Sequence, residues 1–106
     1  MSNAVIQIRP ATVADVPLIL ALIRELATFE REPDAVIATE ALLTEQLFGQ
    51  HPAAEVLIAE RDDVPAGFAL FFHGFSTWQG RRGLYLEDLF VRPDSRGHGV
   101  GMALMR

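Results

Sequence analysis

The feature that most constrains this chain is an apolar segment that is followed at once by a glycine-rich turn and a second apolar stretch. Residues 84–91 are apolar except for two adjacent acids, which is typical of a strand. Residues 96–102 hold three glycines at alternate positions, and a helical pattern starts at Val100. A strand, a glycine turn and a helix start in this order predict a sheet that is covered by helices.

Upstream of this segment, the sequence predicts three further strands and two helices. The first helix is expected from its cap Thr12, with Asp15 reaching back to complete a capping box, to about Phe29. The second is expected from its cap Thr39 to Gly49. Strands are expected over residues 5–9, 55–60, 66–75 and 84–91, with a turn over 62–65 and a polar loop over 76–82. This order predicts one α/β or α+β domain.

Composition excludes several classes of protein. Half of the 106 residues are hydrophobic, so the chain is not globally disordered. It has no cysteine, which excludes disulfides and a thiol nucleophile, and its three histidines lie far apart, so we expect no metal. The sequence contains neither an apolar run of about 18 residues nor a signal-peptide pattern, so we expect a cytoplasmic protein with no membrane partner.

The charges are distributed unevenly along the chain. Residues 1–63 hold eleven acids and four arginines, whereas residues 64–106 hold three acids and five arginines. The acidic part makes nucleic acid an unsuitable partner, because nucleic-acid binding depends on neutralising phosphates. It either attracts a cationic ligand or forms an ordinary solvated surface, and the later part is better suited to an anion.

The glycine-rich segment has the features of an anion site. Gly97, Gly99 and Gly101 allow the backbone to turn with positive φ, and successive N–H groups can then form a nest for an anion. Arg96 adds a positive charge, and the following helix adds its unpaired N–H groups. The spacing is neither a Walker A loop nor the Rossmann fingerprint. The segment either binds a pyrophosphate or only connects two elements.

Two adjacent acids interrupt the apolar run. With strict alternation, Asp88 shares a face of the strand with Leu84, Leu86 and Phe90, and Glu87 lies on the other face. Burial raises the pKa of a carboxyl group, and a general base near neutral pH requires such a shift. The alternative is a strand that reaches the surface at this point, with both acids solvated.

A further acidic group follows the first helix. Phe29 and Glu30 end that helix, and Glu32 and Asp34 come close behind. Acids at a helix C-terminus oppose the helix dipole. These side chains therefore either face a cation or form an exposed charged loop.

These motifs occur together in one known family. Residues 96–101 resemble the acetyl-CoA signature Q/R-x-x-G-x-G/A of GNAT-type N-acetyltransferases. Further segments resemble the diamine (spermidine/spermine) acetyltransferase branch in the same order: residues 8–12, 24–27, 48–49, 51–52, 67–69 and 84–91. The resemblance implies a GNAT fold, with a mixed, mostly antiparallel sheet and flanking helices. Residues 1–106 would be the N-terminal part of that single domain, up to the start of its third helix.

The resemblance also implies roles for individual residues. Glu87 corresponds to the acid that accepts the amine proton, and the Leu89 N–H would stabilise the oxyanion. The backbone of Leu89, Phe90 and Val91 corresponds to the segment that binds the pantetheine arm of acetyl-CoA. The pyrophosphate would be held by Arg96, Gly97, His98, Gly99, Val100, Gly101 and Met102. The amine would be bound by Phe29, Glu30, Glu87 and Asp88, and by Ser76, which stands where the diamine enzymes carry an acid.

The resemblance predicts an N-acetyltransferase that moves the acetyl group of acetyl-CoA to a primary amine of a small polyamine- or diamine-like substrate, by direct attack and without a metal. The alternatives are a GNAT enzyme for amino acids or protein N-termini, and a non-catalytic CoA-binding or dimerisation module. A homodimer is expected. The family's tyrosine general acid would lie beyond Arg106, so we expect residues 1–106 alone to be a poor catalyst.

Overall fold

The computed structural model describes residues 5–76 and 80–105. Its main elements are, in chain order, β1 (Ile6–Pro10), α1 (Val16–Phe29), α2 (Glu40–Phe48), β2 (Ala54–Arg61), β3 (Val64–Ser76), β4 (Arg81–Val91) and α3 (Val100–Leu104). This is the predicted order of strands and helices. None of the helices in the described ranges is long and apolar enough to cross a membrane.

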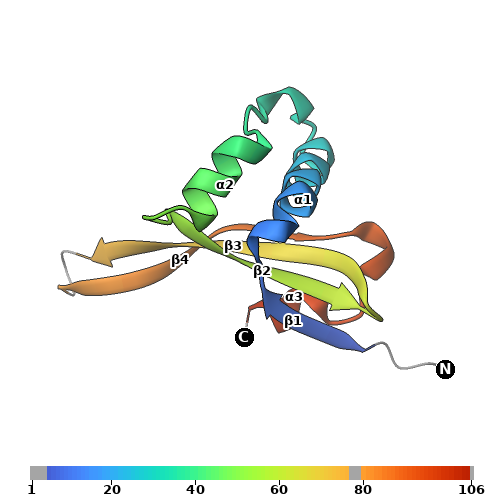
Figure 1. Cartoon of the computed structure of the whole chain (residues 1–106). Helices are drawn as coiled ribbons and strands as arrows, with labels where there is room; N and C mark the ends of the chain where they lie inside the picture. Colours follow the sequence, from blue (N-terminus) through green and yellow to red (C-terminus); the bar gives the residue numbers. More distant parts are fainter. Residues whose placement is uncertain (1–4, 77–79, 106) are drawn as a thin grey trace.

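The four strands form one sheet in the order β1-β2-β3-β4, and every pairing between them is antiparallel. Figure 1 shows α1 and α2 on one side of this sheet and α3 on the other. The connection between β2 and β3 is a two-residue turn in which Asp62 and Asp63 have φ values of 53° and 67°. Positive φ at both positions matches the twist of the flanking strands. The predicted α+β class, an antiparallel sheet with flanking helices, is confirmed.

Each face of the sheet has its own hydrophobic core. On the α1 and α2 face, Phe68 at the centre of the sheet is fully buried among side chains of both helices. On the opposite face, α3 contributes Val100 and Leu104. The sheet meets α3 with small side chains: Ala59, Ala66 and Ala69. Because alanine fills little space, this short helix lies close to the strands. The chain segment that precedes α3 is therefore held near the end of β4.

Thr39 caps α2 as predicted, whereas the predicted capping box of Thr12 and Asp15 begins a short 3-10 helix, Val13–Asp15, that leads into α1 at Val16. The Thr39 hydroxyl accepts a hydrogen bond from Leu42 N–H at 3.2 Å, and Gly49 ends α2 as expected. The Asp15 carboxylate reaches back to the Thr12 N–H at 2.7 Å. These contacts satisfy backbone N–H groups that the first helical turn leaves without partners.

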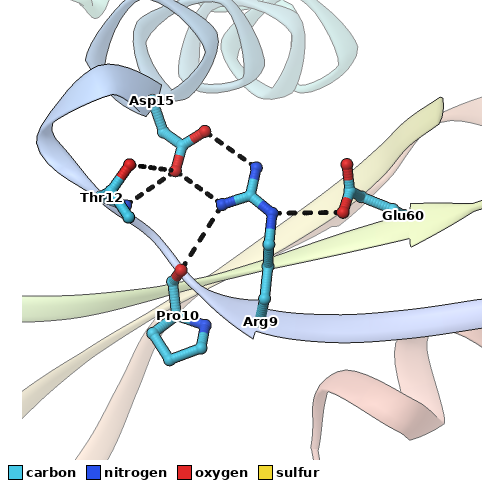
Figure 2. A network of polar contacts seen from close by, with 5 residues as sticks. All are labelled: Arg9, Pro10, Thr12, Asp15 and Glu60. Atoms are coloured by element: carbon cyan, nitrogen blue, oxygen red, sulfur yellow. Dashed lines mark hydrogen bonds and ion pairs between the residues drawn. The ribbon is translucent and has the colours of Figure 1, made fainter. Parts of the chain in front are cut away.

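An arginine-paired cluster, formed by Arg9, Asp15 and Glu60, connects β1 to β2 and to the start of α1 (Figure 2). Two guanidinium nitrogens of Arg9 donate to Asp15 at 2.7 and 2.8 Å, and Arg9 Nε donates to Glu60 at 3.2 Å. The hydrogen bond from Arg9 is the largest influence that lowers the pKa of Asp15 below its ordinary value.

The connection between β3 and β4 is shorter than predicted. Pairing continues to Ser76 and Arg81, so the two ends of the expected polar loop over 76–82, namely Ser76, Arg81 and Arg82, extend the two strands. Residues 77–79 lie outside the described ranges. The polar composition of this stretch indicated a loop, but the ladder with the partner strand determines where a hairpin turns.

In the described part of the chain β4 is an edge strand, and its apolar side chains are unusually exposed. Leu84 is 57% exposed, Tyr85 42% and Leu86 40%. The Tyr85 ring stacks on Phe72 at a centroid distance of 5.3 Å, which covers part of both rings. The apolar side chains over residues 84–86 of β4 are therefore only partly covered.

Candidate active site

A β-bulge at Glu87 sets the geometry of the candidate site. Leu70 on β3 pairs with Asp88, and the next residue, Phe71, pairs with Leu86, so Glu87 has no partner on β3. A bulge re-aims the side chains around it and sharpens the local twist of the strand. The acid that the sequence singled out is therefore the one inserted residue of β4.

The bulge changes the faces that strict alternation predicted for β4. Paired residues of antiparallel strands point to the same face, so Asp88 lies with its partner Leu70 on the α1 side. Leu86 lies with its partner Phe71 on the α3 side. The prediction that Leu84 and Leu86 share a face with Asp88 is wrong, because one extra residue shifts the alternation by one position.

Three carboxylates from two distant segments gather beside the bulge, and we call Glu30, Glu87 and Asp88 the acidic cluster. Asp88 is half-buried, whereas Glu30 and Glu87 are exposed. Burial is the main cause that raises the pKa of Asp88, and the charges of Glu87 and Glu30 raise it further. The acids at the end of α1 and the acidic pair of β4 were separate candidates in the sequence. In the structure they belong to one site.

The end of α1 is held in a defined shape. Arg31 adopts the left-handed region with a φ of 62°. Its N–H donates to Thr28 O at 3.0 Å, and the Glu32 N–H donates to Ala27 O at 2.7 Å. This pair of bonds is a Schellman motif, which ends a helix and satisfies its last carbonyl groups. It fixes the last helical residue, Phe29, and the following Glu30 at the rim of the site.

A second arginine connects the exit of β4 to α1. Arg92 follows β4 and donates to the Glu25 carboxylate through Nε at 3.0 Å and through Nη2 at 2.8 Å. Its Nη1 donates to Pro65 O at 3.1 Å. Paired bonds of this kind hold a guanidinium in one orientation. The segment that carries the glycines therefore leaves the sheet at a fixed place beside α1.

The glycine segment adopts the conformation expected of a nest at two of its three glycines. Gly97 and Gly99 have φ values of 83° and 81°, whereas Gly101 lies inside α3 with helical geometry. The prediction of positive φ at Gly101 is therefore wrong, because the helix has already begun at Val100. A Cβ at either Gly97 or Gly99 would meet no atom within 4 Å, so conformation and open approach, not crowding, require glycine there.

The other predicted members of this loop differ in what they can offer. His98 and Met102 are exposed, and Met102 is 70% exposed. Val100 is buried in the core on the α3 face. His98 and Met102 therefore add exposed surface beside the glycines, whereas Val100 holds the start of α3 on the sheet.

Arg96 points toward α1 and lies on two aromatic rings. Its guanidinium carbon is 4.4 Å from the centre of the Phe29 ring and 5.8 Å from that of Phe90, and the two rings are 6.4 Å apart. Its Nε donates to Val91 O at 2.9 Å. These are the distances of cation–π contacts. The sequence did not predict this stack, because its members lie far apart along the chain.

Hydrogen-bond alternation leaves part of the β4 backbone facing the outer edge. Arg92 N–H donates to Ala66 O at 2.7 Å, and the groups of an antiparallel strand that point toward one neighbour recur at every second residue. The N–H groups of Leu89 and Val91 therefore point away from β3. The Val91 carbonyl, which accepts from Arg96, agrees with this direction. Of the three residues predicted to bind the pantetheine arm through their backbone, Leu89 and Val91 thus offer N–H groups on the open side of the strand, whereas the backbone of Phe90 faces β3.

A hollow of about 420 Å³ lies beside these groups, and its wall contains Arg24, Glu25, Thr28, Phe29, Phe90 and Pro93. A larger apolar hollow of about 560 Å³ contains none of the predicted site residues. Ser76 is not brought to the acidic cluster, because it lies six residues along β3 from Leu70, a distance of roughly 20 Å in a strand. Its side chain lies outside the description.

Known proteins share both the sequence and the fold. The family model "Acetyltransferase (GNAT) family" matches residues 19–106. A thialysine N-epsilon-acetyltransferase of Bos taurus is 38% identical over 111 residues, which cover 97% of this chain and 65% of the bovine protein. Spermidine/spermine N(1)-acetyltransferase-like protein 1 of Homo sapiens is 38% identical over 94% of this chain and 15% of its own length. The chain therefore spans less than two thirds of either relative.

Solved structures share the fold of this chain as well. A ribosomal-protein-alanine N-acetyltransferase from Brucella melitensis biovar Abortus 2308 superimposes with a TM-score of 0.74 at 25% identity, over 95% of this chain and 67% of that one. An integron cassette protein from Cole Harbour Salt Marsh gives a TM-score of 0.78 at 26% identity, over 93% of this chain and 64% of that one.

Proposed function

Because the chain belongs to the acetyltransferase (GNAT) family, as its motifs predicted, we propose that it transfers the acetyl group of acetyl-CoA to a primary amine of a small cationic substrate. The names of the relatives, which include thialysine and spermidine/spermine enzymes, agree with an amine that carries a second charged group. The observation that carries the proposal is that β4 joins the acidic cluster, at its bulge, to the glycine nest that follows its end.

The acidic cluster supports a cationic amine as the substrate. The helix C-terminus of α1 adds the negative end of its dipole to the charges of Glu30, Glu87 and Asp88. None of the arginines whose side chains the structure describes forms an ion pair with these three acids. An incoming ammonium group would supply the positive charge that the cluster lacks.

The amine has to lose a proton before it can attack. An alkylammonium group has an ordinary pKa near 10.4, so at pH 7 only about one molecule in 10³ is neutral. Glu87 is the proposed proton acceptor, either directly or through one water, because the bulge leaves it outside the ladder and exposed. The same carboxylate would first attract the cation and then accept its proton.

The reaction itself is a direct transfer. The neutral amine nitrogen forms a bond to the thioester carbonyl carbon, and the tetrahedral intermediate places a negative charge on oxygen. The outward N–H of Leu89 is positioned to donate to that oxygen, and a single donor of this kind contributes roughly 3 kcal/mol in other acyl-transfer enzymes. The carbon–sulfur bond then breaks, the nitrogen gives up the proton that left it positively charged, and the departing CoA thiolate takes up one proton, so the products are the N-acetyl amide and the free thiol.

Binding of coenzyme A offers a direct test. Gly99→Val is expected to weaken the affinity sharply, because a β-branched residue resists a φ of 81° and fills the approach to the N–H groups. Gly80→Val is the matched control, since Gly80 also has positive φ, at 63°, and open space around it, but lies in the β3–β4 turn. Calorimetry that finds equal affinities for the two variants would refute the nest as the pyrophosphate site.

A panel of amines tests the substrate class in the full-length protein. Diamines should be acetylated with a higher kcat/KM than monoamines of similar size that carry no second charge, because the acidic cluster attracts the second charge. Faster acetylation of a peptide N-terminus than of any diamine would instead support the alternative family activity. Binding of coenzyme A without transfer to any amine would support a binding module.

A further inference from the structure

The stack of Arg96 on Phe29 and Phe90 places one of the chain's own cations where a cationic substrate would bind. Phe29 is 59% exposed, and its face is covered by the guanidinium at 4.4 Å. The ring lines the hollow beside α1, together with Phe90. We call the faces of Phe29 and Phe90 the aromatic seat.

The aromatic seat has the properties of a cation-binding surface. Aromatic faces attract ammonium and guanidinium groups, and the attraction grows where water is partly excluded. Here the seat also lies beside Glu30 and Asp88 and at the C-terminal end of α1, all of which favour positive charge. Two cations cannot occupy the same ring face, so Arg96 and a substrate ammonium compete for it.

Arg96 also directly precedes the nest formed around Gly97 and Gly99. A pyrophosphate in that nest would offer Arg96 bidentate hydrogen bonds in which both partners are charged, whereas the bond from its Nε to Val91 O has an uncharged acceptor. The same side chain is therefore within reach of two alternative partners, a ring and an anion.

We propose that Arg96 occupies the aromatic seat until coenzyme A binds, and that the pyrophosphate then draws Arg96 away and opens the seat to the substrate amine. This inference rests on the proposed function and assigns Arg96 as a positioning residue that couples its two substrates. Since binding free energies are reciprocal, the amine must also tighten the binding of coenzyme A.

The movement of Arg96 has a direct spectroscopic signature. In the free protein, the side-chain protons of Arg96 should carry ring-current shifts from Phe29, which the variant Phe29→Leu identifies. Saturating coenzyme A should remove these shifts, and inorganic pyrophosphate at higher concentration should remove them as well. Ring-current shifts that persist when coenzyme A is bound would overturn the inference and leave the proposed function intact.

Equilibrium binding of 1,4-diaminobutane measures the coupling. Saturating coenzyme A should tighten diamine binding to the unaltered chain by about 5- to 150-fold, the range typical of coupled sites. Arg96→Gln should bind the diamine with the same affinity with and without coenzyme A, because the seat is always open. Coupling of unchanged size in Arg96→Gln would overturn the inference.

The control variant is Arg24→Gln, which removes an exposed arginine from the wall of the same hollow. It should retain the coupling, which excludes a general effect of lowered positive charge. Loss of coupling in Arg24→Gln to the same extent as in Arg96→Gln would also count against the inference. Failure of the unaltered chain to bind coenzyme A at all would refute the proposed function together with this inference.

Discussion

The molecule holds two groups of carboxylates in opposite ways. In the arginine-paired cluster, Asp15 and Glu60 share one guanidinium, with three hydrogen bonds of 2.7 to 3.2 Å from Arg9. In the acidic cluster, the charges of Glu30 and Glu87 both act on Asp88, and none of the three acids pairs with an arginine whose side chain the structure describes. The pKa of Asp15 is lowered and that of Asp88 is raised, although both are aspartates of the same sheet domain.

This difference separates a structural role from a functional one. Carboxylates that are paired within the fold stabilise it, because the native state favours their charged form. Carboxylates that are gathered without a cation destabilise the fold slightly and leave the charge available for a ligand.

The largest expected effect belongs to the acidic cluster and concerns catalysis. In the full-length protein, Glu87→Gln should lower kcat/KM by about 10²- to 10⁴-fold below about pH 8, because the amine is then protonated and needs a proton acceptor. The effect should shrink as the pH approaches the pKa of the amine. Acetyl transfer to a diamine across a pH series measures it.

The matched control for this prediction is Glu55→Gln on β2, since Glu55 is an exposed acid that contacts His73 Nε2 at 3.3 Å on the surface. It should leave kcat/KM nearly unchanged. If Glu87→Gln behaved like this control over the whole pH series, Glu87 would have no part in proton transfer.

The parts of the fold that were predicted correctly depend on signals that act between residues close together in the sequence. The caps Thr12 and Thr39 and the apolar spacing behind them act over a few residues, so both helices were found with nearly correct ends. The positive φ of Gly97 and Gly99 also followed from local chemistry. The family resemblance extended this reading to the whole chain.

Features that depend on distant partners were missed. The bulge at Glu87 arises from the register with β3, and alternation within β4 alone contains no information about it. The contact between Arg9 and Glu60 requires the pairing of β1 with β2, 51 residues apart in sequence. The position of Arg96 on Phe29 likewise exists only after α1 and the glycine segment have been brought together.

The second prediction concerns stability and the arginine-paired cluster. Arg9→Gln should lower the free energy of unfolding by about 2 kcal/mol at pH 7, because it leaves the carboxylates of Asp15 and Glu60 half-buried and unpaired; the figure is reduced for their partial exposure. Urea denaturation measures it. Arg24→Gln, which changes an exposed arginine, should stay within about 0.5 kcal/mol.

The pH dependence checks the physical cause of this loss. Because the folded-state pKa of Asp15 is lowered, its stabilising effect is present above the unfolded value of about 3.9 and is lost as the pH falls toward the folded value. As the pH is lowered from 5, the free energy of unfolding should therefore fall less in Arg9→Gln than in the unaltered chain. An equal acid-induced loss in both proteins would show that the pairing with Arg9 is not its source.

The smallest expected effect has the opposite sign and concerns Asp88. Its folded-state pKa is raised, chiefly by burial, so the fold is favoured most below the unfolded value of about 3.9 and loses this contribution as the pH rises through the folded value. Asp88→Asn removes that charge and should raise the free energy of unfolding at pH 7, by up to about 1 kcal/mol, while the gain disappears in acid. The same variant should bind 1,4-diaminobutane more weakly, because the acidic cluster has lost one of its charges. A variant that is less stable at pH 7 and binds the diamine equally well would place Asp88 with Asp15 as a structural carboxylate and would remove the distinction between the two groups.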